Sequence, residues 1–585
     1  MTHQVGSSTV SLTEEELTIT IPRAFWSKKQ WVWLTQLLLQ VILSQLLLQV
    51  ILSGANWIIA PSTPSPSSGE GRKARWKLIC IDALSGLLFA LLIRSSHPLR
   101  KLFSAIDWDQ IDERCAKVYK NAERGAPAYA PQVLFRILLL MFSSGTPFES
   151  ATLQRLETDV AWRWFVGLNL WMSVPNAGTL SRFRKRLGVE LFEAILIDLI
   201  LVCDAAGLIG HEESYYDMTG VEASATQVTP YQRAVILAKA MTTWLDQNQG
   251  GLGMMDREQV ARIALEVLRE VHPSLNKVSP AQIVSSQERL AKQWGEDEPK
   301  SPGWWQRIVQ TLCELTPQGV GSALESLRQV ASELVFRLPQ AFGNPDATVG
   351  HTRTNGTLCG YRSGFLVDAK RLIITAVVVV RLSQSEAPTV VTALEQHYAV
   401  FGKYPKQLGL DSAFDRDEVH RYTEPREIFT SITIRARPGV AGVYHAEAFV
   451  WNEEGQLLCP HGQEMVQVGG LYKDGTQRYQ ATGECAKCPH KQGCLTDKQA
   501  QKDNPRRELR TNPGAHQRAQ RHRERSRTPE GKDIRRRRFA SESVFGHTNH
   551  YHNGDKAPYR DGAMDTIAQI MVAYVSNLEK LAKPI

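Results

Sequence analysis

The chain has 585 residues, of which 43% are hydrophobic and 22% are charged, with a formal net charge of +8. A chain of this length exceeds what a single hydrophobic core supports, so we expect several domains of ordinary globular composition. The nine cysteines fall into a scattered group and a clustered group, which excludes a secreted disulfide framework and indicates a reducing cytoplasm. The positive charge is concentrated in a few segments, and that asymmetry carries information about partners.

Residues 1–96 form an N-terminal extension with two apolar runs joined by a Pro/Ser/Gly-rich linker. Within the first run the block QLLLQVILS occurs twice in succession, which suggests a recent duplication in the DNA. Segments 34–60 and 78–93 are candidates for membrane attachment, because apolar runs with flanking Trp and Lys are typical of membrane spans. Three glutamines in the first run and Asp82 in the second argue against a span. The alternatives are an apolar helix that packs on the body, or an unselected extension.

Residues 97–210 are predicted to form a helical DNA-binding region. Near its end the sequence VPNAGTLSRFRKR predicts a turn and then a helix, with Thr179 as the N-cap residue. A basic final helix suits helix-turn-helix docking on DNA. The basic residues on it are our first DNA-binding candidates: Arg182, Arg184, Lys185 and Arg186. A solvated basic helix face is the alternative.

Residues 211–445 contain two stretches in which strand-forming residues lead into an acid. Asp217 lies in SYYDMTGVEASA, and Asp411 follows the apolar strand predicted at Gln407–Leu410. The C-terminal end of a buried strand is where an α/β sheet presents catalytic groups, although aspartate there is also common turn chemistry. Further strands and one helix predict a mixed α/β sheet. These are strands at 361–368, 372–382 and 431–436, and a helix at 387–401.

A helical insertion is predicted at 227–340, between the first and second strands of this sheet. Apolar residues from Val260 to Val271 recur with a period of 3.6, and Asp256 and Gln259 are spaced as a capping pair. Its role stays open between DNA clamping and dimerisation.

Residues 446–504 carry the clustered cysteines. Four thiolates can hold a tetrahedral zinc ion, and here they would come from Cys459, Cys485, Cys488 and Cys494. His461 and His490 are competing ligands, and a loop of reduced cysteines is the alternative.

Residues 505–585 begin with a strongly basic segment. Between Arg506 and Arg538 there are twelve Arg and one Lys against four acids, and Pro and Gly residues predict a partly irregular conformation. Such a segment suits a phosphate backbone, since arginine grips phosphate bidentately and each neutralised phosphate releases a counterion. A solvated tail is the alternative, but a patterned apolar helix at 563–581 leads the chain back into folded core. Our DNA-binding candidates in the segment are Arg535, Arg536, Arg537 and Arg538.

Glu542 follows Arg538 by one helical turn, and three distant acids now stand out: Asp217, Asp411 and Glu542. Their order and basic context resemble the catalytic regions of bacterial insertion-sequence transposases of the DDE class that have an InsH-like N-terminal region. HPLRKLFSAIDWDQI and PQVLFRILLLMFSSG resemble the start of that region, while GYRSGFLVD and LGLDSAFD resemble strands two and four of the family core. The resemblance covers roughly 97–226 and 345–582.

The resemblance implies an RNase H-like core in which Asp217, Asp411 and Glu542 hold two Mg²⁺ or Mn²⁺ ions. It implies a transposase that binds element ends and catalyses DNA cleavage and strand transfer without a small-molecule cofactor. We expect a homo-oligomer on double-stranded DNA, at the terminal inverted repeats and the target, in the cytoplasm with the nucleoid. Cysteine-bearing insertions also occur in related transposases.

One departure from the family pattern concerns the positioning of DNA ends. The family usually has a Lys about seven residues after the Glu, and this chain has Asn549. The alternative function is therefore a catalytically inactive or repurposed DNA-binding protein derived from a transposase, and a membrane-attached protein is a further rival. Asp368 and Asp415 are the competing acids.

Overall fold

The computed structural model describes residues 82–583 except 83, 117, 119–128, 147, 248–254, 295–302, 315–322, 353–355 and 435–442, and three short strands before residue 21. Those strands, β1 (Thr2–Val5), β2 (Ser8–Leu12) and β3 (Leu17–Thr20), form an antiparallel sheet in a unit of residues 1–67, separate from the unit of residues 68–585.

The candidate membrane segment 34–60 lies outside the described residues. Of 78–93, residues 82 and 84–93 are described, and 84–92 are helical. Within the described ranges, no helix combines the length and the apolar character needed to cross a membrane.

A bundle of helices follows, as predicted for 97–210. Its elements are α3 (Pro98–Ser104), α4 (Trp108–Ala116), α5 (Pro131–Ser143), α6 (Glu149–Thr158), α7 (Val160–Val166) and α8 (Ala177–Ala205). The predicted N-cap was wrong: α8 begins at Ala177, and the Asn176 side chain accepts a hydrogen bond from the Thr179 N–H. Asparagine caps a helix at least as well as threonine does. α8 is kinked at Gly188, whose φ is 71°.

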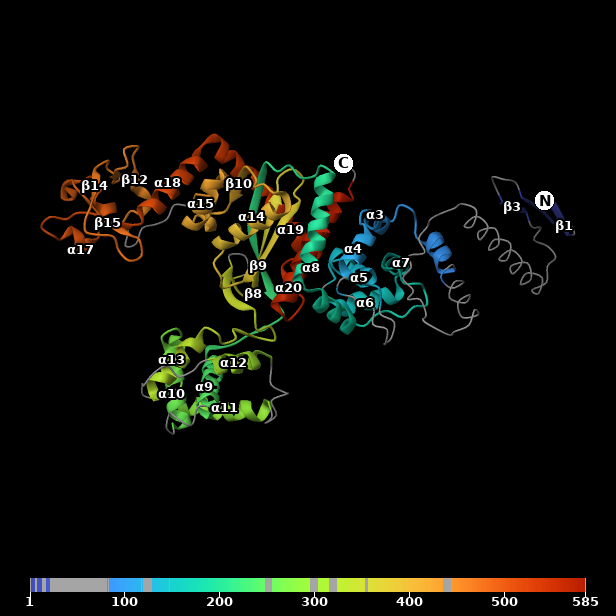
Figure 1. Ribbon diagram of the computed structural model, residues 1–585, viewed down its shortest axis with the longest axis horizontal. Helices are drawn as coiled ribbons and strands as arrows, with labels where there is room; N and C mark the ends of the chain where they lie inside the picture. Colours follow the sequence, from blue (N-terminus) through green and yellow to red (C-terminus); the bar gives the residue numbers. More distant parts are fainter. Residues whose placement is uncertain are drawn as a thin grey trace. The chain divides into compact units, whose positions relative to one another are not determined.

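The central sheet is mixed, and β4 (Glu213–Ala223) is its middle strand (Figure 1). β4 pairs antiparallel with β8 (Gly356–Asp368), which pairs antiparallel with β9 (Ile374–Arg381) and β7 (Thr348–Thr352). On its other edge β4 pairs parallel with β10 (Gln407–Leu410) and β17 (Lys556–Ala557), and β10 pairs parallel with β11 (Phe429–Ile432). The mixed α/β sheet and the strand at Gln407–Leu410 are confirmed. The strand predicted at 431–436 begins and ends earlier.

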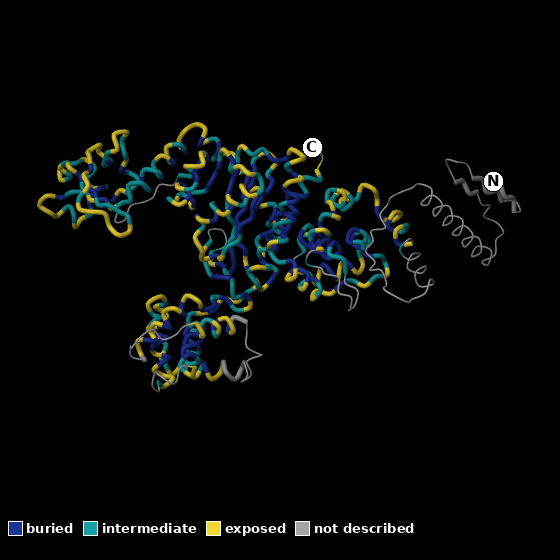
Figure 2. The backbone as a smooth tube through the Cα atoms, in the orientation of Figure 1, coloured by how far each residue is buried: buried dark blue, intermediate teal, exposed yellow. Residues whose placement is uncertain are grey.

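Both faces of the sheet are covered by helices, because strand residues alternate between two cores. Phe365 and Val367 of β8 face a core shared with α5, α8 and α20 (Gly562–Leu581), whereas Leu366 faces a core shared with α14 (Ala387–Phe401). Figure 2 shows these strands and α20 as mostly buried. The apolar stripe predicted for the last helix is confirmed.

The helical insertion has its own hydrophobic core, which includes Trp244. Its helices are α9 (Pro230–Gln247), α10 (Arg257–Arg269), α11 (Pro280–Trp294), α12 (Gly303–Glu314) and α13 (Ala323–Val335). Asp256 and Gln259 form the expected capping box at the start of α10. At the two ends of the insertion, where the chain leaves the central sheet and returns to it, β5 (Thr226–Gln227) pairs with β6 (Ala341–Phe342).

The clustered cysteines belong to a region with a second, antiparallel sheet. Its strands are β12 (Val450–Trp451), β13 (Leu457–Leu458), β14 (Glu464–Gln467), β15 (Gln477–Ala481) and β16 (Glu508–Thr511). A small core with Phe449, Tyr479 and Leu509 stabilises it. Because β16 pairs with β15, this sheet extends past residue 504.

Most of the arginine-rich segment is helical, but its start consists of irregular residues and strand β16 (Glu508–Thr511), so the prediction of a partly irregular conformation holds only for that start. The helical residues belong to α18 (Pro513–Arg527) and α19 (Pro529–His552), with Asn512 and Thr528 as N-cap residues. Each proline is the first residue of its helix, where the missing N–H costs no hydrogen bond. The prolines therefore begin the helices.

Candidate active site

Asp217 and Asp411 lie side by side on adjacent parallel strands. Leu410 of β10 is in register with Tyr216 of β4, so the next residue of each strand is an aspartate. Neighbouring strands are about 4.8 Å apart. Each carboxylate accepts a hydrogen bond from the backbone N–H that follows it, at 2.8 Å from Met218 and 2.6 Å from Ser412. The sheet thus presents two fixed carboxylates at one point.

Glu542 reaches the same place from α19 through an arginine. Arg538 Nη1 lies 2.8 Å from Asp217 Oδ2, and Arg538 Nη2 lies 3.5 Å from Glu542 Oε1, one helical turn further along. The Arg538 side chain is 13% exposed, and that of Glu542 is 47% exposed. Arg538 therefore joins Asp217 to Glu542, with Glu542 on the solvent side, and Asp411 lies beside Asp217 on the next strand. In the described residues the ligand atoms of the three acids do not all lie within 4.8 Å of one another.

Gly409 explains how α19 comes so close to β10. A Cβ atom at this position would lie 2.9 Å from the Tyr215 ring, 3.3 Å from Ile534 and 3.4 Å from the Cβ of Arg538. The last two residues belong to α19, so the missing side chain sets the distance between this helix and the strand that precedes Asp411. That distance places Arg538 and Glu542.

The electrostatics of the cluster are those of like charges held near a cation. Burial raises the pKa of Asp217, and the neighbouring Asp411 raises it further, whereas the Arg538 guanidinium and the Met218 N–H oppose the rise. The net direction is upward. A carboxylate whose charge is disfavoured in this way gains from an additional cation.

The first competing acid, Asp368, has a structural role. It is fully buried and accepts hydrogen bonds from the backbone N–H groups of Gly210, His211 and Lys370 at 2.9–3.0 Å. These bonds join the turn before β4 to the turn after β8.

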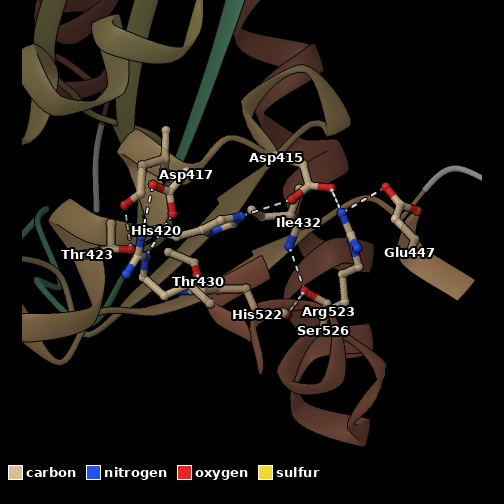
Figure 3. A network of polar contacts seen from close by, with 12 residues as sticks. Asp415, Asp417, His420, Thr423, Thr430, Ile432, Glu447, His522, Arg523 and Ser526 are labelled. Atoms are coloured by element: carbon tan, nitrogen blue, oxygen red, sulfur yellow. Dashed lines mark hydrogen bonds and ion pairs between the residues drawn. The ribbon is translucent and has the colours of Figure 1, made fainter. Parts of the chain in front are cut away.

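The second competing acid, Asp415, belongs to the network in Figure 3. His420 of α15 (Asp417–Thr423) lies 3.0 Å from its carboxylate, and Arg523 of α18 donates to it at 3.1 Å. Burial alone would raise the pKa of Asp415, but His420 and Arg523 outweigh burial and lower it to about 2. Arg523 also contacts Glu447 at 2.8 Å. Asp415 therefore attaches α18 to the strand end that carries Asp411.

The same network joins α18 to β11 through buried hydroxyl groups. Ser526 accepts a hydrogen bond from the Ile432 N–H at 3.0 Å, and Thr430 is hydrogen-bonded to His522. The His420 and His522 rings stack at 4.1 Å. Burial and the neighbouring His420 lower the pKa of His522 to about 3, so this ring is neutral. The contacts in Figure 3 hold the arginine-rich helix against the sheet.

The four basic candidates on α8 divide into two kinds. Arg184 is 4% exposed, pairs with Glu149 and lies over the Tyr559 ring at 3.9 Å. It is therefore out of reach of a DNA phosphate, and we remove it from the candidates. The three others are exposed: Arg182, Lys185 and Arg186.

Three of the four basic candidates on α19 contact other parts of the protein. Arg535 donates to the carbonyl oxygens of Ser526 and Ile432, and Arg537 pairs with Glu213 at 2.7 Å. Arg538 holds the acid cluster. Arg536 has an 82% exposed side chain and contacts Asp533 at 2.6 Å, so it is the member of this set that faces solvent most.

The four cysteines predicted to bind zinc are free thiols. Burial raises the pKa of Cys494, and Cys459, Cys488 and Cys485 raise it further. In the described residues, the one group of three or more His, Cys, Asp or Glu with ligand atoms within 4.8 Å of one another is a different one: His547, His552 and Glu579. Sequence reasoning missed it, although GHTNHYH places three histidines within six residues.

Comparison with known proteins gives two matches. Residues 89–186 match the model of a transposase domain, DUF772, and residues 458–582 match the model of a transposase DDE domain. The second match includes Glu542, and both aspartates lie between the two matched segments. No curated protein and no solved structure matches the chain significantly.

Both matched models describe transposases. One match lies in the N-terminal helices and the other covers a DDE domain, and together they support an insertion-sequence transposase of the DDE class.

Proposed function

We propose that the chain is an active transposase that binds the ends of its element, cleaves DNA phosphodiesters and transfers the freed strands. The observation that carries the proposal is that Arg538 of α19 contacts both Asp217 and Glu542, while Asp411 directly follows the parallel strand that pairs with the strand of Asp217. The family matches support a transposase, and this geometry supports the particular residues.

The order of the strands supports an RNase H-like core. Two antiparallel strands, β8 and β9, lie on one side of β4, and two parallel strands, β10 and β11, lie on the other. Asp217 lies within the central strand β4, and Asp411 directly follows β10, the parallel neighbour of β4. The helix that carries Glu542 then packs beside them.

The donor set fits two hard divalent cations, Mg²⁺ or Mn²⁺, because three carboxylates supply the oxygen ligands that these ions prefer. Asp217, Asp411 and Glu542 would hold them. When bound, such ions activate the attacking oxygen and stabilise the leaving oxygen of an in-line displacement.

The residues of the chain position the reaction. Asp217 and Asp411 are fixed by their backbone hydrogen bonds, and Glu542, being exposed, is free to adjust as a substrate arrives. Arg538 neutralises part of the carboxylate charge in the protein alone. Once other cations share that charge, its guanidinium is available to a flanking phosphate.

The reaction consists of two displacements at phosphorus. Water attacks the phosphodiester at the element end, the P–O3′ bond breaks, and the 3′ oxygen leaves as a hydroxyl. That hydroxyl then attacks a target phosphodiester and displaces a target 3′-hydroxyl. We place DNA contacts on the exposed basic residues of α8 and on Arg536, and a homo-oligomer on paired element ends in the nucleoid.

The test is nicking of a supercoiled plasmid by the full chain with Mg²⁺ or Mn²⁺. Asp411→Asn removes one carboxylate charge and should lower the rate by roughly 100-fold or more, because metal-assisted stabilisation contributes several kcal/mol. The matched control is Glu418→Gln, which also replaces a carboxylate by its amide, at an exposed position of α15. If both variants nick at the wild-type rate, the catalytic assignment is wrong and a DNA-binding role remains.

A further inference from the structure

Three side chains meet on the C-terminal half of α19, away from the acid cluster. His547 and His552 come from α19, and Glu579 comes from the last turn of α20. His547 Nε2 lies 2.9 Å and His552 Nε2 lies 3.5 Å from the same carboxylate oxygen, Glu579 Oε2. One ligand atom from each residue lies within 4.8 Å of the others.

The hydrogen bonding of His552 directs a lone pair into this group. Its Nδ1 lies 3.0 Å from the Phe142 carbonyl oxygen of α5 and must donate to it, because a carbonyl oxygen only accepts. In the neutral ring, Nε2 is then an acceptor. The residue is 1% exposed, and Nε2 has no hydrogen-bond partner among the described residues.

This buried nitrogen faces another acceptor. A distance of 3.5 Å to Glu579 Oε2 is too long for a hydrogen bond and short enough for two lone pairs to repel. Buried polar atoms are nearly always satisfied, so an orphaned acceptor aimed at a carboxylate needs a cation between them. A metal ion or a second ring proton would meet that need.

The dimensions fit a metal ion. Ligands at about 2.0–2.1 Å from a tetrahedral zinc ion are about 3.3 Å apart, close to the observed 2.9 and 3.5 Å. The side chains of His547 and Glu579 are 37% and 26% exposed, which leaves an entry path and room for a water ligand. The Phe142 carbonyl behind His552 is the outer-shell acceptor that metal-binding histidines usually have.

We propose that His547, His552 and Glu579 bind one Zn²⁺ ion. The two imidazoles and one carboxylate are a mixed N/O set that suits Zn²⁺ better than the hard, all-oxygen set proposed for the acid cluster. The ion joins α19 to α20 and, through Phe142, restrains α5. Its role is structural, and it fixes the end of the helix that carries Glu542.

The experiment uses the full chain with all four clustered cysteines replaced, as Cys459→Ser, Cys485→Ser, Cys488→Ser and Cys494→Ser, so that no thiolate of that region can hold zinc. Metal content after dialysis, and the melting temperature with and without added Zn²⁺, are measured. We expect about one zinc per chain and a melting temperature that rises with Zn²⁺ and falls with a chelator. Bound Co²⁺ should show no thiolate charge-transfer band.

The decisive variant is His552→Asn, because the asparagine amide can still donate to the Phe142 carbonyl while Nε2 is lost. It should abolish both the bound zinc and the response of the melting temperature. His547→Asn, at a half-buried position, should do the same and serves if the first variant does not fold. His550→Asn changes an exposed histidine of the same helix and should keep the zinc.

The proposal is overturned if the protein without the clustered cysteines binds no zinc, or if its zinc survives both histidine substitutions. It is also overturned if the melting temperature responds to pH but not to Zn²⁺, since a ring proton then lies between His552 and Glu579. None of these readouts depends on DNA cleavage, so the zinc site and the proposed function succeed or fail separately.

Discussion

The two basic segments of the chain look alike in sequence and are used differently in the structure. On α8, three of the four candidates are exposed and Arg184 is buried. On α19 the proportion is reversed, because Arg535, Arg537 and Arg538 contact other elements of the protein. Local charge density in the sequence therefore identifies a basic segment. Which of its cations stay exposed and able to contact DNA depends on pairing with residues far away in the sequence.

The partners of the arginine-rich segment come mainly from the region that follows Asp411. Arg518 pairs with Asp417 at 2.8 Å, Arg521 with Glu424 at 2.8 Å, and Arg523 with Asp415 at 3.1 Å. The planar guanidinium suits bidentate pairing of this kind. Much of the charge that suggested a DNA-binding segment holds α18 to the core.

The largest expected effect is a loss of stability at Arg184, which tests whether this arginine differs from its exposed neighbours on α8. Arg184→Met should lower the free energy of unfolding by about 3–5 kcal/mol, because it leaves the carboxylate of Glu149, whose side chain is 12% exposed, without its cation. Chemical denaturation measures the loss. The exposed neighbour Arg182→Met is the control and should stay within about 0.5 kcal/mol of wild type. Equal stability of the two variants would contradict the buried role.

The next effect tests the arginine of the acid cluster. Arg538→Gln should slow metal-dependent nicking by roughly 100-fold, about 2.7 kcal/mol, because a positioned cation is lost from the reacting centre. Lys532→Gln, at an exposed position of the same helix, should change the rate little. Affinity for DNA, measured by fluorescence anisotropy, should fall far less than the rate in Arg538→Gln. A parallel fall of both would indicate a DNA-binding residue only.

A third test concerns the stabilisation that His420 and Arg523 together give through Asp415. The pKa of Asp415 is lowered from 3.8 to about 2, so the stabilisation is complete above pH 4 and is lost as the pH falls through 2. The shift corresponds to about 2 kcal/mol. Denaturation between pH 4 and pH 2 should show this loss in the wild type. Asp415→Asn should lack that part of the pH dependence and be less stable at pH 7.

The smallest effect is expected at a single exposed cation of α8. Lys185→Gln should remove about one phosphate contact, lower the slope of log affinity against log salt by about 0.9, and weaken binding roughly tenfold at 0.1 M salt. Lys101→Gln, at an exposed position of α3, is the control. An unchanged salt slope for Lys185→Gln would exclude this face of α8 from the DNA contact.

The parts of the fold that depend on local patterns could be predicted from sequence. The apolar run before Asp411 predicted β10, and the apolar stripe of the last helix predicted α20. Predictions from local sequence were wrong where one residue type occurs in two structural settings. Pro513 and Pro529 suggested breaks and instead begin helices, and Thr179 lies inside a helix that Asn176 caps.

The sequence allowed us to choose the acidic residues of the candidate site, but it did not predict how they are arranged in space. Asp217 and Asp411 stand out because each follows strand-forming residues, and the choice of Asp411 over Asp415 depended on the end of the apolar run. The register between β4 and β10, and the packing of α19 at Gly409, join residues far apart in the chain. Such pairings come from tertiary packing, which local sequence does not encode.

The short ladder between β5 and β6 has a consequence for biosynthesis. During translation β4 appears long before β8, its antiparallel partner, and until then its edges lack hydrogen-bond partners. The helices between them have a separate core and can fold first, as domains generally do on the ribosome. Their folding brings residues 226–227 next to 341–342. The loop that must close before β8 pairs with β4 is then short, and the entropy cost of closing it is smaller.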